Sequence, residues 1–300
     1  MKKRKKDSDL KKNVVFNIQS IIMSVLMAIT LVTIVTMGFL LYQRFKLAMD
    51  KMAVSNTEAT VESTVDRVNS DLLDIRQIFN AANYNIVQEF DISSEKFAEQ
   101  FSLLYEVNSD KIESLALYGN EGQLIASEPV AVEKENIDVT GQDWYKNAES
   151  AIENVHFSVP HIQNLYEDGL YRYHWVVSLS RYVDINDGEI PGSGVLLVDM
   201  KYSVIEDVLK QINDSSEGIY YYMISRDGQM IYHPRKTEMA RGLFEENSLK
   251  ASGYEEGTYE ITTDGHKESV VVGNIAYTGW KLIGVVPDSV QTARLNNYRY

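Results

Sequence analysis

Asp199 is the residue whose place in the sequence most needs a chemical explanation. It follows the apolar run from Gly194 to Val198, which is typical of a strand buried on both faces. A carboxylate in such a position needs a partner or a hydrogen-bond network, because burial without one is costly. Two interpretations stay open: contact with a bound ligand, or a structural bond to a nearby backbone amide or to Arg181.

Aromatic residues offer apolar surface for the same ligand. Trp144 and Tyr145 stand at the start of a short predicted helix that covers residues 144–151. Other aromatic candidates belong to predicted strands: Tyr118, Tyr171, Tyr173 and Trp175. The last three alternate along one strand and therefore share one face. An aromatic face packs into a core more often than it cages a ligand, so core packing and pocket lining are both open.

No constellation typical of an enzyme is present in these residues. The five histidines are scattered and form no metal-binding pair of the HxxxH or HExxH type. The chain has no cysteine, no Gly-x-Ser-x-Gly sequence and no phosphate-binding loop. Residues 184–188 faintly resemble a calcium loop, but Ile185 offers no side-chain oxygen, so a hairpin turn is the better interpretation. We therefore expect no metal, no cofactor and no catalytic residue here.

The distribution of charge predicts a membrane anchor. Residues 1–12 carry seven basic and two acidic side chains, whereas the whole chain has a net charge of −14. Residues 13–43 contain no charged side chain and exceed the roughly 20 residues that span a bilayer. The apolar stretch is too long for a cleaved signal peptide and lacks a small-x-small cleavage site. It therefore predicts a single transmembrane helix.

Basic residues on the two flanks predict the orientation of that helix. Seven precede it and three follow within twenty residues, so the N-terminus is expected in the cytoplasm and residues 45–300 outside the cell membrane. The acidic character of the outer part excludes nucleic acid as a partner, since phosphates would be repelled.

Residues 44–84 predict a long stalk helix. They contain no proline or glycine, and from Val61 to Ala82 apolar residues recur at alternating spacings of four and three. We expect this seam to pack on its own domain. Pairing with a second subunit, near the membrane, is the alternative and underlies the expectation of a homodimer.

Beyond residue 85 the pattern changes to short strands and helices. The hairpin sequence from Leu115 to Ile125 returns 106 residues later, from Tyr221 to Ile231, with the shared core acidic-Gly-Gln-aliphatic-Ile. Further strands follow each copy, which predicts two related α+β lobes. Ser203 and Glu206 have the spacing of a capping box and predict the start of a helix that runs to about residue 212.

This order of elements resembles the double Cache domain of bacterial transmembrane receptors. The residues that carry the resemblance are the span and stalk helix, the paired hairpins, Asp143–Tyr145, Gly194–Met200 and Gly279–Pro287. The resemblance implies an α+β fold with two stacked PAS-like antiparallel lobes. The expected boundaries are residues 85–205 for the membrane-distal, ligand-binding lobe, 206–290 for the membrane-proximal lobe, and 291–300 for the start of a helix toward a second span.

The resemblance also implies a ligand site in the distal lobe. Amino-acid-binding members have an Arg-x-Trp-Tyr element for the ligand carboxylate and a strand aspartate for the amine. Here Gln142 replaces the arginine, and His161 replaces a tyrosine that often follows Ser-x-Pro. Losing the guanidinium removes two charge-assisted bonds, which favours a neutral or cationic ligand. The expected site residues are Trp144, Tyr145, Asp199, Gln142, His161, Tyr118 and Tyr173.

The same resemblance implies signalling across the membrane. The expected whole protein is a sensor histidine kinase of a Gram-positive bacterium, with its kinase beyond these residues and a cognate response regulator as partner. A chemoreceptor or diguanylate cyclase is the alternative output, and a membrane-tethered surface or adhesion protein is a further one. Ligand binding would shift the C-terminal helix relative to the stalk helix.

Overall fold

The computed structural model describes residues 18–130, 132–135, 137–150, 155–167, 172–188, 190–216, 218–263 and 265–287. A long helix leads into two antiparallel sheets with short helices, which confirms the predicted α+β double Cache fold. The predicted basic tail, the first residues of the predicted span, Tyr171 and the helix predicted at 291–300 lie outside the described residues.

Helix α1 (Ile18–Ala82) runs through both the predicted span and the predicted stalk, and continues into a π-helical turn, η1 (Asn83–Val87). The chain divides into two compact units at Met52, so α1 belongs to both. In the first unit, the described side chains from Ile18 to Tyr42 are exposed. This is the one helix among the described residues that is long and apolar enough to cross a membrane.

Hydroxyl groups within this apolar segment bond back to its own helix. Thr30 Oγ1 donates to Leu26 O at 2.8 Å, and Thr36 Oγ1 donates to Val32 O at 2.7 Å. These hydroxyls are therefore satisfied within the helix, as a membrane-spanning segment requires.

In the second unit, the heptad seam of α1 packs on its own chain, as predicted. The seam residues exposed by less than 1% are Val68, Leu72, Ile75, Phe79 and Ala82. Polar contacts flank the seam: Asn69 Oδ1 accepts from Ala276 N at 2.9 Å, and Lys111 Nζ pairs with Asp74 at 2.7 Å. The helix therefore contacts both lobes through one face.

Two glycines bring a sheet close to α1. A Cβ atom on Gly273 would lie 2.7 Å from Val61 Cγ1 and 2.8 Å from Val65 Cγ2, and one on Gly284 would lie 2.7 Å from Thr57 Cγ2. Those distances are shorter than van der Waals contact, so only glycine permits this approach of strand to helix.

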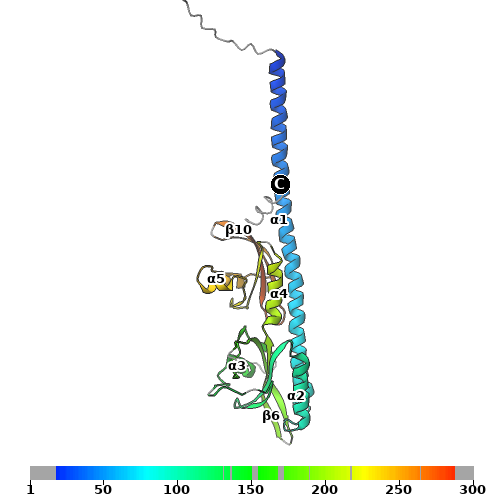
Figure 1. The fold of residues 1–300 in the computed structure, drawn as a ribbon, viewed down its shortest axis with the longest axis vertical. Coiled ribbons are helices and arrows are strands. Elements are labelled where there is room, and N and C mark those ends of the chain that lie inside the picture. Colours follow the sequence, from blue (N-terminus) through cyan, green and yellow to red (C-terminus); the bar gives the residue numbers. More distant parts are fainter. Residues whose placement is uncertain are drawn as a thin grey trace, which may run out of the picture. The chain divides into compact units, whose positions relative to one another are not determined.

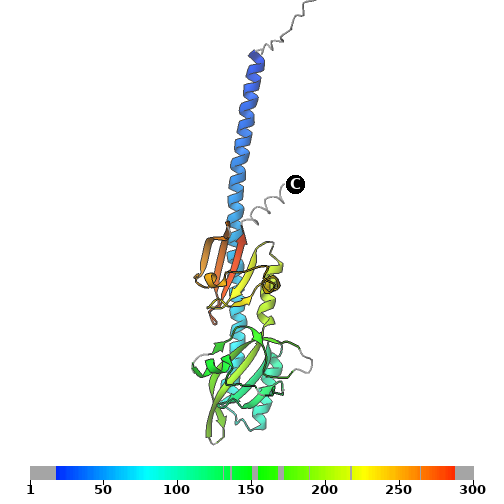
Figure 2. The ribbon, with the colours of Figure 1, turned by 90° about the vertical axis from the view of Figure 1, so that its left-hand side faces the viewer.

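The N-terminal lobe contains the first sheet, in the order β2-β1-β6-β5-β3, with β4 also paired to β5. Its strands are β1 (Ile112–Gly119), β2 (Leu124–Glu128), β3 (His156–Phe157), β4 (His161–Ile162), β5 (Trp175–Asp187) and β6 (Ile190–Lys201). The long β5–β6 hairpin reaches further than the other strands (Figure 2). The strands continue pairing to Asp187 and Ile190, so the hairpin connection is shorter than the turn predicted at residues 184–188.

The C-terminal lobe contains the second sheet, in the order β8-β7-β11-β10-β9. Its strands are β7 (Tyr220–Ile224), β8 (Met230–Tyr232), β9 (Gly257–Thr263), β10 (His266–Asn274) and β11 (Lys281–Pro287). The strand orders of the two sheets correspond. In each sheet a hairpin (β1–β2 or β7–β8) forms one edge, and its first strand pairs with the last strand of the lobe (β6 or β11). The internal repeat predicted from the two hairpins is therefore confirmed.

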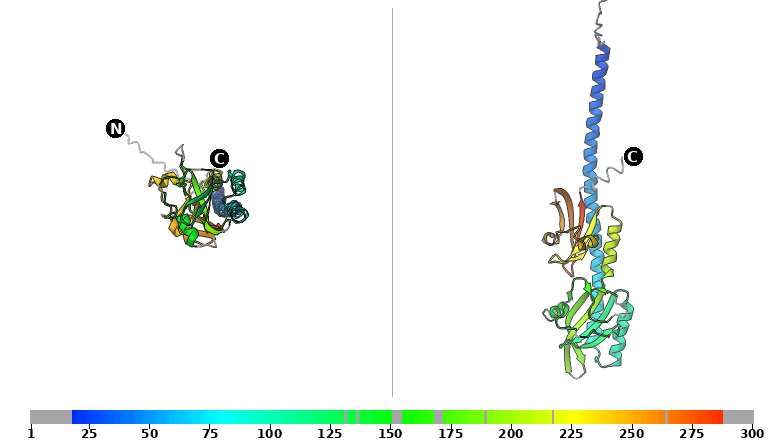
Figure 3. Two further views of the ribbon diagram at one scale, coloured as in Figure 1. Left: turned by 90° about the horizontal axis from the view of Figure 1, so that it is seen from below. Right: turned by 60° about the vertical axis from the view of Figure 1, so that its left-hand side comes forward.

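Helices cover both faces of the sheets. They are α2 (Glu95–Asn108), α3 (Asp143–Ser150), α4 (Ser203–Asp214), α5 (Lys236–Ala240) and α6 (Ser248–Ser252). Helices α1 and α4 lie on the same side of the second sheet (Figure 1). Helices α3 and α5 lie on the opposite side of the sheets from α1 (Figure 1), and Figure 3 shows α4 running beside α1. Each lobe therefore has one face packed on the long helix and one face available for a site.

The predicted capping box is wrong. Helix α4 begins directly after Tyr202, whose carbonyl accepts from the amides of Ile205 and Glu206 at 3.0 Å. Ser203 therefore lies inside the first turn, and no side-chain cap forms. Glu206 instead pairs with Lys236 Nζ at 2.6 Å.

Candidate ligand-binding site

A row of polar side chains crosses the middle of the N-terminal sheet. On β6, Asp199 lies opposite Ser114 of β1 and Ser178 of β5. Ser114 Oγ donates to Asp199 Oδ2 at 2.8 Å, and Ser178 Oγ donates to Oδ1. Asp199 is only 1% exposed. Both carboxylate oxygens are thus satisfied, by two hydroxyls rather than by a backbone amide or by Arg181.

Burial raises the pKa of Asp199 above its ordinary value of 3.8. The hydrogen bonds from Ser178 and Ser114 and the proximity of His161 favour the ionised form and partly oppose that rise in pKa. His161 Nε2 lies 3.4 Å from Ser178 Oγ, with the donor set by the histidine tautomer. A continuous polar path therefore runs from buried Asp199 through Ser178 to His161.

His161 opens onto a cavity of about 550 Å³. Three of the predicted site residues line it, namely Gln142, Trp144 and His161. Among its described lining residues the only acidic or basic side chain other than histidine is Asp143. The volume falls in the range of small-molecule sites, about 300–1,000 Å³. Its walls offer hydrogen bonds and the aromatic surfaces of Trp144 and Phe157, but no described ammonium or guanidinium group for a ligand carboxylate.

Helix α3 positions the aromatic part of the site. Trp144 lines the cavity and is 5% exposed, and its carbonyl accepts from Ser180 Oγ of β5 at 2.7 Å. Tyr145, on the next position, is fully buried, and its hydroxyl donates to Gly119 O at 2.8 Å. Of the two neighbours, the tryptophan faces the cavity, and the tyrosine fixes the helix to the sheet.

Tyr118 supports the cavity wall from behind. Its ring centroid lies 5.4 Å from that of Trp144, and its hydroxyl lies 3.1 Å from that of Tyr166. Burial raises the pKa of Tyr118, so its hydroxyl remains protonated. Tyr173, by contrast, is 78% exposed and does not line the cavity.

Several cavity residues were not singled out from the sequence. They are Asn147 of α3, His156 and Phe157 of β3, and Ser158, Val159, Ile162, Asn164, Ser180 and Gln229. A helical spacing would have found Asn147, which lies three positions after Trp144 on the same face. Strands β3 and β4 have two residues each, too few to show an alternating pattern.

The fold and this site have recognisable relatives. The Cache domain family matches residues 41–295. The chain belongs to the Cache domain family. Because Cache domains sense extracellular ligands, this is a sensor domain, and with the apolar segment of α1 it indicates a membrane receptor with an extracellular domain.

Two curated relatives are chemotaxis proteins of Bacillus subtilis. The methyl-accepting chemotaxis protein McpA is 22% identical over 271 residues, which cover 87% of this chain and 37% of McpA. TlpB is also 22% identical, over 86% of this chain and 37% of its own length. The chain thus spans little more than a third of the length of these relatives.

Solved Cache structures show the same fold. The ligand-binding domain of the Pseudomonas fluorescens chemoreceptor CtaA, in complex with L-isoleucine, has a TM-score of 0.57 and 17% identity. The match covers 83% of this chain and 98% of that one. The Pseudomonas aeruginosa amino acid chemoreceptor PctC, in complex with GABA, has a TM-score of 0.58 and 16% identity, covering 80% and 99%.

Proposed function

We propose that the chain is the extracellular input module of a bacterial chemoreceptor and binds a small neutral or cationic solute in the cavity of its N-terminal lobe. The observation that carries this proposal is the cavity beside His161, whose described walls are polar and aromatic and include no lysine or arginine. A carboxylate ligand would lose its hydration there without gaining a charge-assisted partner.

The chemotaxis relatives support a chemoreceptor output over the histidine kinase expected from the sequence. McpA and TlpB match this chain along most of its length. The proposed output is therefore signalling through chemotaxis proteins. It replaces the expected histidine kinase in the same polypeptide, which would phosphorylate a response regulator. A diguanylate cyclase or an adhesion protein finds no counterpart in those relatives.

Orientation and assembly form part of the same proposal. The excess of basic residues before the apolar segment supports a cytoplasmic N-terminus, with residues 45–300 outside. A homodimer is proposed through the part of α1 before Met52, where Leu47 and Met52 are exposed. Pairing there leaves the seam residues on their own lobes.

The ligand site is tested with the full chain in detergent. Neutral and cationic solutes of low molecular weight, such as amides, polyols and amines, are screened by their effect on the melting temperature. A solute that binds only the native state raises this temperature. Trp144→Ala is expected to abolish the shift, because it removes the larger of the two aromatic surfaces of the cavity, the other being Phe157.

Trp175→Ala is the matched control, since this tryptophan is 50% exposed and lies outside the cavity lining. It should retain the full shift. A shift that survives in Trp144→Ala, or that disappears only in Trp175→Ala, would place the ligand elsewhere and contradict the proposal.

A further inference from the structure

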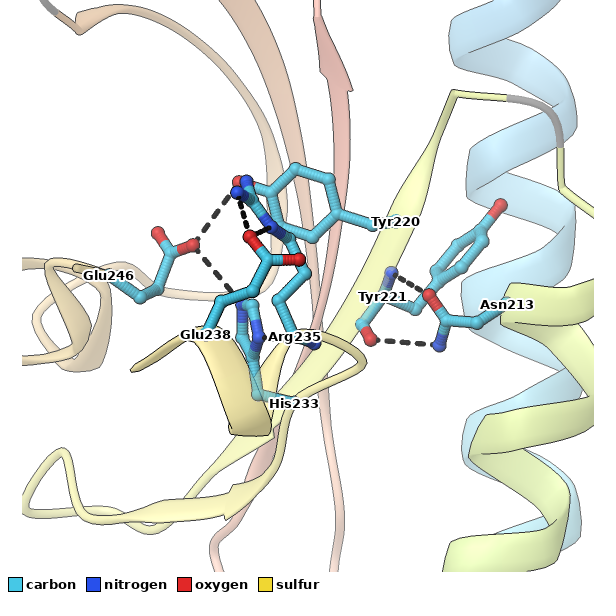
Figure 4. A network of polar contacts seen from close by, with 7 residues as sticks. All are labelled: Asn213, Tyr220, Tyr221, His233, Arg235, Glu238 and Glu246. Carbon is cyan, nitrogen blue, oxygen red and sulfur yellow. Dashed lines mark hydrogen bonds and ion pairs between the residues drawn. The ribbon is translucent and has the colours of Figure 1, made fainter. Parts of the chain in front are cut away.

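The C-terminal lobe has a cavity of its own, of about 850 Å³. It lies on the face of the second sheet that points away from α1. The cavity of the N-terminal lobe lies on the corresponding face of the first sheet. Along β7 the side chains alternate: Tyr220 and Tyr222 line the cavity, whereas Tyr221 belongs to the core packed on the long helix. Asn213 of α4 fixes Tyr221 through both backbone groups, at 2.9 and 3.0 Å (Figure 4).

The walls of this cavity combine aromatic rings with carboxylates. The aromatic lining residues are Tyr220, Tyr222, Phe244 and Tyr254. The charged ones are Glu245, Glu246, Glu268 and Lys250. Three carboxylates against one ammonium group give the described lining a net negative charge, and the electron-rich ring faces attract cations as well.

Glu246 is held in place before any ligand arrives. Its Oε2 accepts from the hydroxyl of Tyr220 at 3.1 Å and lies 3.4 Å from Nε2 of His233 (Figure 4). Burial raises the pKa of Tyr220, so its hydroxyl stays protonated and donates. Both contacts use Oε2, and Tyr222 is a further side-chain hydrogen-bond partner of Glu246.

His233 is buried behind these residues, with 1% of its surface exposed. The backbone N–H of Arg235 donates to Nδ1 at 3.0 Å, so the neutral ring carries its proton on Nε2. Among the described residues Nε2 forms no hydrogen bond, and it faces the Glu246 carboxylate. A buried polar group of this kind is uncommon and calls for an explanation.

One aromatic ring of the cavity lining, that of Phe244, already contacts a positively charged side chain. The guanidinium carbon of Arg235 lies 3.8 Å above the centroid of Phe244. Tyr220 and Tyr222 stack at 6.2 Å, and the His233 ring lies within 5.8 Å of both. Rigid, prearranged rings and a fixed carboxylate cost little entropy when a cation binds.

We propose that this cavity is a second ligand site, selective for an organic cation such as a quaternary ammonium or amine. It is separate from the solute site of the N-terminal lobe and does not depend on it. Glu246 supplies the counter-charge, and Tyr220, Tyr222 and Tyr254 supply the ring surfaces.

Choline is the probe, and 3,3-dimethyl-1-butanol, which has the same shape without the charge, is the matched neutral compound. Isothermal titration of the full chain in detergent is expected to show choline binding and no binding of the neutral compound. Glu246→Gln should weaken choline binding about 10-fold or more, since the negative charge that attracts the trimethylammonium group is lost. Lys250→Met should tighten it about 3-fold, because it removes a like charge from the wall.

Trp175→Ala, in the other lobe and outside both cavity linings, should leave choline binding unchanged. If Trp144→Ala abolished choline binding, choline would occupy the proposed solute site instead, and the present proposal would be overturned. If Glu246→Gln does not fold, as judged by its melting curve, the exposed Lys250 decides the question. The proposal is overturned if choline gives no heat up to about 10 mM, if the neutral compound binds equally, or if Lys250→Met weakens or does not change choline binding.

Discussion

Ser178 and Asp199 face each other across β5 and β6, and the serine hydroxyl donates to Oδ1 of the buried carboxylate. Ser114 holds the other oxygen from β1. This pair joins the centre of the sheet to His161 at the cavity. The protonation state of Asp199 therefore bears on both the stability of the lobe and the polar path that reaches the cavity.

The stability contributed by Asp199 should fall as pH rises. Because burial raises its pKa in the folded chain, the contribution is fully present below the unfolded value near 3.8 and is lost as pH rises through the folded value. We expect the melting temperature of the wild type, minus that of Asp199→Asn, to decrease between about pH 4 and pH 8. Thermal melts of both proteins across this range measure it. A difference that is constant or that grows with pH would show that ionised Asp199 is not penalised by burial.

Gln142→Arg should create a partner for a carboxylate in the N-terminal cavity. A charge-assisted pair of bonds adds roughly 1.5–3 kcal/mol, which corresponds to about a 10- to 100-fold gain in affinity. We expect free α-amino acids to raise the melting temperature of this variant more than that of the wild type. Gln142→Ala, which has no guanidinium, is the control. Equal responses of the wild type and Gln142→Arg would mean that residue 142 does not face the ligand carboxylate.

Gly273→Ala should destabilise the C-terminal lobe. The new methyl group would meet Val61 and Val65 at 2.7 and 2.8 Å, so strand and helix must separate. Overpacking of this kind costs about 1–3 kcal/mol, measurable by urea unfolding of the full chain. The control is Gly253→Ala, where the added atom lies 3.4 Å from Lys250 O at a negative φ. The interpretation fails if the two variants unfold at the same urea concentration.

The orientation can be tested cleanly because the chain has no cysteine. A cysteine at Leu103, which is 49% exposed on α2, should react with a membrane-impermeant maleimide added to intact cells. A cysteine at Lys5 should react only after permeabilisation, since the excess of basic residues retains that end in the cytoplasm. If the cysteine at position 5 reacts in intact cells and the one at position 103 reacts only after permeabilisation, the topology is the opposite of the one proposed.

Long, periodic segments made the fold predictable. The seam from Val61 to Ala82 and the echoed hairpins gave the long helix and the two lobes, because burial imposes a strict spacing on apolar residues. The position of α4 was predicted correctly, but its capping box was not, because Tyr202 rather than Ser203 precedes the first turn. Domain boundaries at 84/85 and 205/206 stay predictions; they fall inside η1 and α4.

The site was predictable only where a residue carried an unusual chemical demand. Asp199 could be singled out because it is a charged residue within an apolar strand. Its two serine partners lie 85 and 21 residues away in the sequence, so no local pattern predicts them. Trp144 and Tyr145 are adjacent and of similar size, and only the docking of α3 decides which of them faces the cavity. Tyr173 had the right residue type, yet it precedes β5 and is exposed.

The row of Ser114, Asp199 and Ser178 also disfavours incorrect strand register in the sheet. If β6 paired one residue out of step, Asp199 would turn to the face where Val198 and Leu196 now pack toward the long helix. There the carboxylate would meet apolar side chains and lose both hydroxyl partners, at a cost of several kcal/mol. The slipped sheet is thereby selected against during folding, and the same three side chains that form the polar path to His161 also specify how the strands come together.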